Sequence, residues 1–437
     1  MMEVIEKILR ESKADGTHLV LIEEERSLTR FAGNTIHQNM GREKTTLIIR
    51  VIKGSRVGIF TVDNLDENKW NYALRRAEDI AIRMPEDPDL PSLPTDKPHI
   101  PIDGYFESTA NFSPGERANA IKKAVNPLIK NNLSSSGAFD TRIITTYVAT
   151  STGIMKSFKE TIASFHIIVE SASGSSGWGG AVDRDVRKIN TVQVAERAAE
   201  KALLGKNKIK LPPGKYTVLL EEEPVAHLLL FLAFMGLGGK TFAEGRSFMV
   251  GKIGNRITGE NVTIVDDATD PRTAGMPFDY EGIPKRRVIL IEKGIARDVV
   301  TDSYYAKKLG KESTGHALRP DNKYGPYPKN MIFEGGNIKK EDMIKSIERG
   351  IIITRFWYVN FLNPMKTMVT GTTRNGTLLI EDGKIRGGVD DMRFVISILE
   401  SFSKIKNLSQ ELTLRSKYGA HLLVPQIVVE NFQFTGE

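Results

Sequence analysis

A pattern of β-strands followed by one helix occurs twice in the first half of the chain, and it constrains the fold more than any other feature of the sequence. In the first copy, β-branched and apolar residues predict strands over residues 17–22, 28–31, 45–51 and 57–62. Polar residues between the first two segments predict a turn. Asn64 and Glu67 have the spacing of a capping box. The helix that they would begin has one apolar stripe, formed by Trp70, Ala73, Leu74, Ala77 and Ala81.

The second copy begins about 120 residues later, which is the spacing of an internal repeat of domain size. Strands are predicted over residues 141–148 and 161–169, followed by a glycine-rich corner over 174–180. Asn190 and Gln193 then begin a helix with a similar apolar stripe. We therefore predict an internal duplication whose two copies extend one mixed, mainly antiparallel sheet.

Proline positions divide the chain further. Prolines at 85, 88, 91, 94, 98 and 101 predict an extended connector near residues 85–101. Pro212-Pro213-Gly214 marks a domain boundary, because this run stops the preceding segment and a new strand pattern follows. Beyond it, Lys293-Gly294 and Asp382-Gly383 lie between apolar runs as hairpin turns do. The prediction is an α+β protein with an N-terminal domain over residues 1–212 and a β-rich domain over 213–437.

Composition excludes several classes of function. The chain has no cysteine, and therefore no disulfide, thiolate nucleophile or Cys-containing metal site. Residues 224–239 are apolar but too short to cross a bilayer, and the first ten residues lack the apolar core of a signal peptide, so we expect a cytoplasmic protein. The 61 Lys and Arg residues are interspersed with 54 Asp and Glu residues. Lys285-Arg286-Arg287 leads directly into an apolar run, so this basic cluster indicates the start of a strand more than a nucleic-acid site.

The sequence offers few catalytic motifs. A helical zinc-protease site needs two histidines one turn apart and a glutamate beside the first. His227 stands alone in such a helix, because position 228 is leucine and positions 231 and 232 are phenylalanine and leucine. Gly239-Lys240-Thr241 lacks the earlier glycine of a P-loop. Asp266-Asp267 is interpreted as a turn, and Ser313-Thr314-Gly315-His316 has no nucleophile elbow.

Several longer motifs resemble the TldD/TldE family, whose second member is also called PmbA and which has carried the label "modulator of DNA gyrase". The resemblance covers nearly the whole chain. It rests on residues 31–39 and 48–51, 277–284, 302–310, 313–316, 354–358, 363–364 and 370–376.

The resemblance implies that TldD-like members are metallopeptidases with a His-Glu-x-x-x-His helix and a cysteine as third metal ligand. Carried over by position, the first histidine is His227, the glutamate is Leu228 and the second histidine is Leu232. The cysteine of a Cys-Gly pair falls near Tyr418-Gly419. These losses resemble the TldE branch, and they imply a chain with no catalytic, cofactor or metal residues of its own. His227, His316 and His421 are the candidates for vestigial or chamber-lining residues.

By the same resemblance, this chain would form a heterodimer with a zinc-containing, TldD-like catalytic subunit, or a homodimer, and would help to enclose unfolded or precursor peptides. No membrane or nucleic-acid partner is expected. Two alternatives stay open at this point. One is a stand-alone metal-dependent peptidase whose relocated ligands combine His227 with His316 or His421. The other is a regulator that acts on DNA or a topoisomerase.

Overall fold

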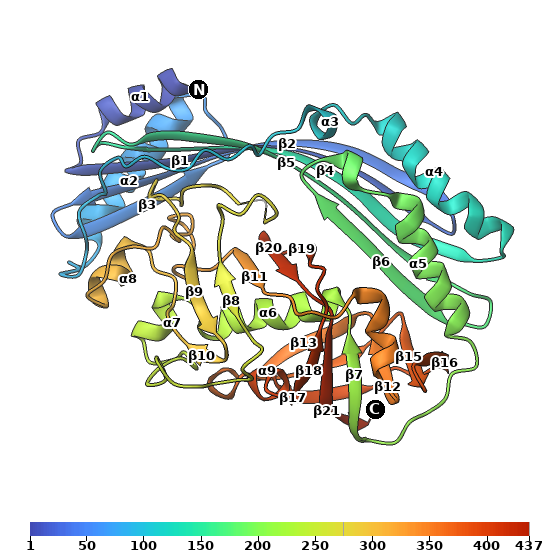
Figure 1. The fold of residues 1–437 in the computed structure, drawn as a ribbon. Coiled ribbons are helices and arrows are strands. Elements are labelled where there is room, and N and C mark those ends of the chain that lie inside the picture. The colour runs from blue at the N-terminus through green and yellow to red at the C-terminus, as the bar shows by residue number, and fades with distance from the viewer. Residues whose placement is uncertain (274, 437) are drawn as a thin grey trace.

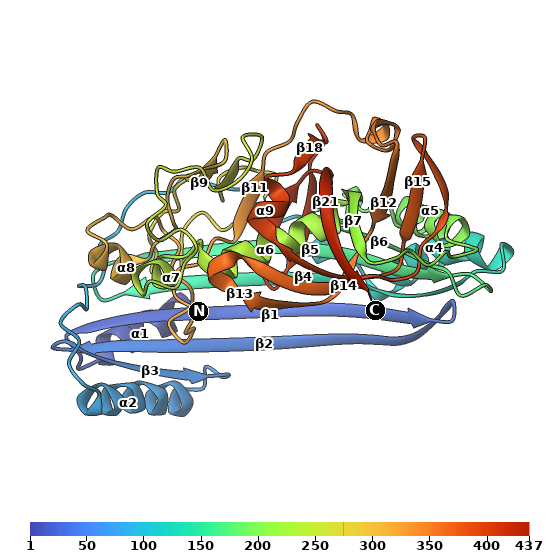
Figure 2. The same cartoon turned by 90° about the horizontal axis from the view of Figure 1, so that it is seen from below.

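The structure is a computed structural model that describes residues 1–273 and 275–436. A long, six-stranded antiparallel sheet arches over the rest of the chain (Figure 1). Viewed from below, β1 and β2 run across almost the full width of the molecule (Figure 2). The strands of this sheet are β1 (Gly16–Ala32), β2 (Thr35–Lys53), β3 (Arg56–Val62), β4 (Ser134–Thr150), β5 (Met155–Glu170) and β6 (Ser176–Asp183). The helices of the same half are α1 (Met2–Glu11), α2 (Glu67–Arg83), α3 (Glu107–Ala110), α4 (Pro114–Lys130) and α5 (Thr191–Leu204), with a short 3-10 turn, η1 (Val186–Lys188).

The strand order confirms the predicted duplication. It is β3-β2-β1-β4-β5-β6, so two copies of a three-strand unit meet at β1 and β4 and extend one sheet. The predicted stripe of α2 is buried with α1 against β1 and β2, and α5 is buried with α4 against β4 and β5. Alternate residues of the strands serve opposite faces: Leu19 and Leu21 face the helices, whereas Val20 packs beside Phe278 of the C-terminal half.

Glycines allow both repeat helices to approach the sheet closely. A Cβ atom added to Gly58 in β3 would lie 1.9 Å from the carbonyl oxygen of Ala77 in α2. A Cβ atom on Gly177 in β6 would lie 2.0 Å from the carbonyl oxygen of Ala198 in α5. The predicted glycine-rich corner over residues 174–180 is confirmed only at Gly174, which lies in a turn with a φ angle of 78°: residues 176–183 form an edge strand, and its Gly177 and Gly179 serve helix packing.

Two further local predictions were wrong. Residues 17–22 and 28–31 belong to one strand, because the polar segment between them is satisfied by ion pairs across the sheet. For example, Arg26 lies 2.5 Å from Asp140 of β4. The expected capping box of α2 is absent: Asn64 accepts a hydrogen bond from the backbone N–H of Asp66, and the helix begins at Glu67. By contrast, Ser113 and Glu116 form the capping box of α4, and Asn190 caps α5.

Residues 85–105, which include the proline-rich segment, form neither helix nor strand. Strands of the first sheet all precede residue 212, and strands of the other two sheets all follow it. The domain boundary at Pro212-Pro213 itself stays a prediction. Among the described residues, no helix has the length and apolarity required to span a bilayer.

The C-terminal half contains two sheets. One has the order β10-β9-β8-β11-β20-β19, and the other β13-β14-β17-β21-β7-β12-β15-β16, with β18 paired to β21. The strands are β7 (Gly214–Leu220), β8 (Ile264–Asp266), β9 (Val288–Glu292), β10 (Ile295–Ala296), β11 (Asn330–Phe333), β12 (Arg349–Ile353), β13 (Phe356–Asn363), β14 (Met368–Thr373), β15 (Thr377–Glu381), β16 (Lys384–Gly388), β17 (Arg393–Ser397), β18 (Ile405–Leu408), β19 (Thr413–Lys417), β20 (Ala420–Val424) and β21 (Ile427–Gly436).

The predicted hairpin turns are confirmed. Lys293 and Gly294 join β9 to β10 with φ angles of 47° and 76°, and Asp382 and Gly383 join β15 to β16 with 52° and 68°. Two consecutive residues with positive φ match the right-handed twist of the strands they connect. The mixed α+β fold with mainly antiparallel sheets is thus as predicted.

The apolar segment near residues 224–239 forms α6 (Glu222–Gly236), which packs between the two C-terminal sheets. It is apolar around nearly its whole circumference, as expected for a helix enclosed by sheets. The remaining helical segments are α7 (Gly239–Ala243), α8 (Ser303–Lys308), α9 (Ile398–Phe402) and the 3-10 turns η2 (Lys340–Asp342), η3 (Ile344–Ser346) and η4 (Pro364–Lys366).

Candidate binding cavity between the two halves

A cavity of about 600 Å³ lies between the arched sheet and the C-terminal half. This volume is within the range of roughly 300–1,000 Å³ that is usual for ligand sites. Strands β4, β5 and β6 form one wall, and segments around β11, α6 and the β19–β20 hairpin form the other. Its polar lining residues are Asp140, Arg142, Glu160, Ser164, His166, Glu223, Tyr280, Lys285, Lys329, Asn330, Arg355, Arg415, Ser416, Tyr418 and His421, together with Trp178.

One end of the cavity is rich in cations. Lys285 donates a hydrogen bond to the side-chain oxygen of Asn330 at 3.1 Å. Lys329 immediately precedes Asn330, and its ammonium group lies 5.4 Å from the ring centre of Tyr280. Both lysines are partly buried, and burial lowers the pKa of their ammonium groups.

Glu160 of β5 faces these lysines from the arched sheet. Burial raises the pKa of its carboxyl group, against the opposing effect of Arg184, Lys329 and Lys285. Arg184 is almost fully buried, and its guanidinium donates to the carbonyl oxygens of Asp103 and Gly275. The arginine therefore connects the sheet to the C-terminal half beside the cavity.

The other end of the cavity combines arginines with aromatic rings. The guanidinium of Arg355 lies 6.0 Å from the ring centre of Trp178 and 5.0 Å from that of Trp357. Arg415 lies 5.9 Å from the ring centre of Trp178 and donates to the carbonyl oxygen of Gly180 at 3.2 Å. These contacts are within the range of cation–π attraction.

The acidic start of α6 is tied to the β19–β20 hairpin. Glu222 is paired with Lys340 and lies 3.4 Å from Arg415. Glu223 is paired with Lys417. Although burial alone raises carboxyl pKa values, these cations outweigh it: the pKa of Glu222 falls to about 2, and that of Glu223 is also lowered. The main partners of these two acids are thus cations from outside the helix.

His227 lies one turn after Glu223, outside the residues that line the cavity, and its ring is 5.3 Å from that of Phe231. Burial, with a further contribution from Lys417, lowers its pKa to about 4. Leu228 and Leu232 are fully buried in the core. The carboxylate near this imidazole, that of Glu223, is engaged by Lys417, so the surroundings of His227 do not fit a zinc site, which needs about three protein ligands.

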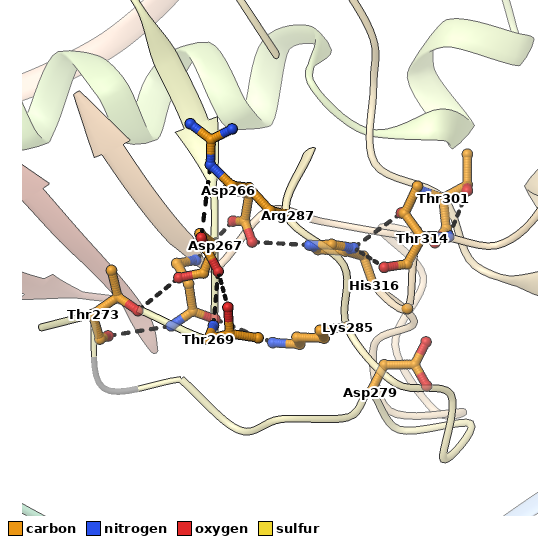
Figure 3. A network of polar contacts seen from close by, with 12 residues as sticks. Asp266, Asp267, Thr269, Thr273, Asp279, Lys285, Arg287, Thr301, Thr314 and His316 are labelled. Carbon is orange, nitrogen blue, oxygen red and sulfur yellow. Dashed lines mark hydrogen bonds and ion pairs between the residues drawn. The ribbon is translucent and has the colours of Figure 1, made fainter. Parts of the chain in front are cut away.

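His316 belongs to a buried network instead of the cavity (Figure 3). Its Nε2 atom lies 2.9 Å from a carboxylate oxygen of Asp266, and its Nδ1 atom lies 2.9 Å from the hydroxyl of Thr314. The other Asp266 oxygen accepts the backbone N–H of Asn330 at 2.8 Å. Asp266 is thus the buried end of β8, contrary to the predicted turn, whereas Asp267 does form a turn by accepting from the backbone N–H of Thr269.

His421 lies on β20 and lines the cavity, so of the three candidate histidines it alone does so. Burial lowers its pKa to about 3, helped by Arg184, Lys329 and Lys285. Its Nδ1 atom is buried without a hydrogen-bond partner among the described residues. The Tyr418-Gly419 pair turns between β19 and β20 with φ angles of 50° and 76°, at the rim of the same cavity.

Within residues 1–273 and 275–436, no three His, Cys, Asp or Glu side chains come together as a possible metal site. The cavity residues missed by sequence reasoning include Glu160, His166, Lys329 and Arg355. Each is a single polar residue in or beside a strand, and only the packing of the two halves brings them together. Lys285 belongs to a basic cluster that is visible in the sequence, but the apolar run after it favoured its interpretation as the start of a strand.

Comparisons with known proteins agree with this fold. The family model described as the PmbA/TldA metallopeptidase C-terminal domain matches residues 213–436, and the central-domain model matches residues 113–205. A curated relative, the metalloprotease TldD homolog of Buchnera aphidicola subsp. Acyrthosiphon pisum, is 25% identical over 396 residues, which span 85% of this chain and 80% of the relative.

Two further relatives extend the comparison. Metalloprotease PmbA of Escherichia coli O157:H7 is 22% identical over 394 residues, spanning 87% of this chain and 84% of the relative. The crystal structure of TldE from Thermococcus kodakarensis superposes with a TM-score of 0.92 at 23% identity, covering 99% of this chain and 100% of that one. The family resemblance is confirmed: this chain belongs to the PmbA/TldD metallopeptidase family.

Proposed function

We propose that this chain is a non-catalytic, TldE/PmbA-like subunit that acts with a TldD-like metallopeptidase on unfolded or precursor peptides. The observation that carries the proposal is the set of side chains around His227. Leu228 lies in the core, and the carboxylate one turn before His227, that of Glu223, is already paired with Lys417. A catalytic zinc ion needs about three protein ligands, which one imidazole and an engaged carboxylate do not supply.

Family membership supports a role in proteolysis, since curated relatives are named metalloproteases. The fold similarity to a TldE structure supports the choice of the partner branch. In this proposal the zinc ion belongs to the TldD-like subunit, and the two chains form a heterodimer. The cavity between the halves would give this chain a part in binding the peptide.

Metal content and cleavage, measured together, test the proposal. The purified chain alone should contain far less than one zinc ion per molecule by inductively coupled plasma mass spectrometry. It should leave an unstructured fluorogenic peptide intact, and cleavage should appear when the TldD-like partner is added. The partner alone is the control, and cleavage by the pair should be the faster of the two. One zinc ion per chain, together with cleavage by this chain alone, would refute the proposal.

The alternative of relocated ligands has less support. Both ring nitrogens of His316 already have partners in the protein, so this residue offers no free lone pair without breaking its network. A His227→Ala variant separates the two ideas. We expect it to leave both the zinc content of the complex and its cleavage rate within about twofold of the unchanged protein, as a residue outside the reaction should. A selective loss of zinc would favour the alternative.

A further inference from the structure

The cationic end of the cavity has the features of an anion site, and the inference drawn from it rests on the proposed function. We propose that Lys285 and Lys329, beside His421, hold a carboxylate group of the bound peptide. Lys285 and Lys329 enter from the C-terminal half, and Glu160 enters from β5 of the arched sheet. A ligand at this end would therefore touch both halves of the molecule.

The charges of the cavity are unevenly paired. Asp140 lies 2.5 Å from Arg26 and 2.8 Å from Arg142, and Glu223 is paired with Lys417. The carboxylates at the aromatic end are thus already neutralised. At the opposite end, no ion pair within 4.0 Å is found for Lys285, Lys329 or Glu160 in the part of the chain that the structure describes.

The lysines at the cationic end lack a close counter-ion. Lys285 is attracted by Asp266 as well as by Glu160, whereas for Lys329 the attraction comes from Glu160. Both lysines are partly buried, and a charge without a close counter-ion is costly in such a position. A ligand carboxylate would supply the missing negative charge and accept hydrogen bonds from the ammonium groups.

His421 provides a second, independent indication. Its side chain is more than nine-tenths buried on the cavity wall, and its Nδ1 atom has no partner among the described residues. Buried polar atoms nearly always have a hydrogen-bond partner, so an orphan at a cavity wall marks a place that a ligand or its water shell completes. The neighbouring backbone is fixed, because the His421 N–H donates to the carbonyl oxygen of Lys329 at 2.6 Å.

A peptide carboxylate has two possible sources, the chain terminus and an Asp or Glu side chain. Three fluorescein-labelled peptides of Gly, Ser, Ala and Gln distinguish them by fluorescence anisotropy with the full chain. The first has a free C-terminal acid, the second a C-terminal amide, and the third is the amide with one internal glutamate. Tighter binding of the first alone identifies the terminus, and tighter binding of the third alone identifies a side chain. Tighter binding of both supports the carboxylate site for either source.

Two variants should change the affinity for the acid-bearing peptide in opposite directions. Lys329→Gln should weaken binding of the acid-bearing peptide about tenfold and leave the amide unchanged, because it removes one charge-assisted hydrogen bond. Glu160→Gln should tighten acid binding, because it removes the competing carboxyl group. Lys345→Gln is the matched control, since Lys345 is exposed and paired with Asp342 outside the cavity. The thermal midpoint of each variant shows that it is folded.

Equal binding of the acid and amide peptides, or no binding of any, would overturn the inference. So would a Lys329→Gln variant that weakens acid and amide alike. These measurements use this chain without its partner and without cleavage. The two tests are therefore independent. The binding data can contradict the carboxylate site without contradicting the proposed non-catalytic role of this chain, and the reverse also holds.

Discussion

At the scale of single residues, a histidine near a hydroxyl group can be structural even when its sequence neighbours suggest chemistry. His316 follows Ser313 and Thr314, but its other partner is Asp266, fifty residues earlier in the chain. Both side chains are fully buried. Electrostatic attraction to the imidazole and hydrogen bonds from it keep the pKa of Asp266 low despite burial. No spacing rule in the sequence links these two residues, because His316 lies on a loop that is held by backbone hydrogen bonds to Thr301, and only the fold places this loop beside β8.

His316→Ala should therefore destabilise the protein by about 3–5 kcal/mol, the usual cost of leaving a buried carboxylate without its partner. Urea unfolding followed by circular dichroism measures this change. His37→Ala is the control, because His37 is exposed on β2, and it should change stability by less than about 0.5 kcal/mol. An equal effect of the two substitutions would contradict the structural role assigned to His316.

At the scale of elements, the contact between each repeat helix and its edge strand depends on glycines, which have no side chain to keep the helix away. Gly177→Ala would force a methyl group against the backbone of α5, and backbone cannot move aside as a flexible side chain can. We expect a loss of about 2 kcal/mol or more in unfolding free energy, and a similar loss for Gly58→Ala at α2. Gly41→Ala in β2 is the matched control, since a Cβ atom there meets nothing within 4 Å.

In thermal unfolding, Gly41→Ala should be neutral or slightly stabilising, because alanine reduces the freedom of the unfolded chain. Gly177→Ala should lower the midpoint. If all three variants unfold together with the unchanged protein, the close packing of α2 and α5 is not a source of stability.

Element patterns were readable from the sequence where a local rule decides them. The apolar stripe of α2, the cap at Asn190 and the hairpin turn at Asp382-Gly383 all follow from residues within about one turn of each other. The errors arose where tertiary contacts override such rules. Residues 174–180 have the glycine content of a loop, but in the structure Gly177 and Gly179 allow α5 to pack closely on a strand. The cavity is lined by residues from both halves of the molecule, so the set of lining residues could not be predicted from the sequence.

At the scale of the whole molecule, the two halves are joined by buried polar contacts as well as by apolar packing. The His18 ring lies 2.7 Å from the carbonyl oxygen of Tyr280, and the Lys156 ammonium donates to the carbonyl oxygen of Gly282 at 2.9 Å. Beside this junction, Arg50 of the arched sheet shares a pocket with Glu281 and Asp302 of the C-terminal half. The same pocket is also lined by Asp87, Lys240, Arg319 and Lys323, and within it Glu281 and Asp302 are two acids that repel each other.

The burial of Asp302 beside Glu281 predicts a pH-dependent stability. Burial, and next the neighbouring Glu281, raise the pKa of Asp302 to about 7, against the effects of the Tyr305 N–H and Arg50. Since the folded pKa lies above the unfolded value near 3.9, the contribution of this group is complete below about pH 4 and is lost as pH rises through 7. The unchanged protein should therefore lose stability between pH 5.5 and pH 8.5.

Asp302→Asn removes the titration but preserves the helix cap, because asparagine can accept the Tyr305 N–H as aspartate does. Relative to the unchanged protein, this variant should gain on the order of 1 kcal/mol of unfolding free energy between pH 5.5 and pH 8.5. Urea midpoints at three pH values measure the difference. The control is Asp382→Asn, an exposed acid in a hairpin turn, whose curve should stay parallel to that of the unchanged protein. If the Asp302→Asn curve is parallel too, the junction between the halves does not titrate in this range.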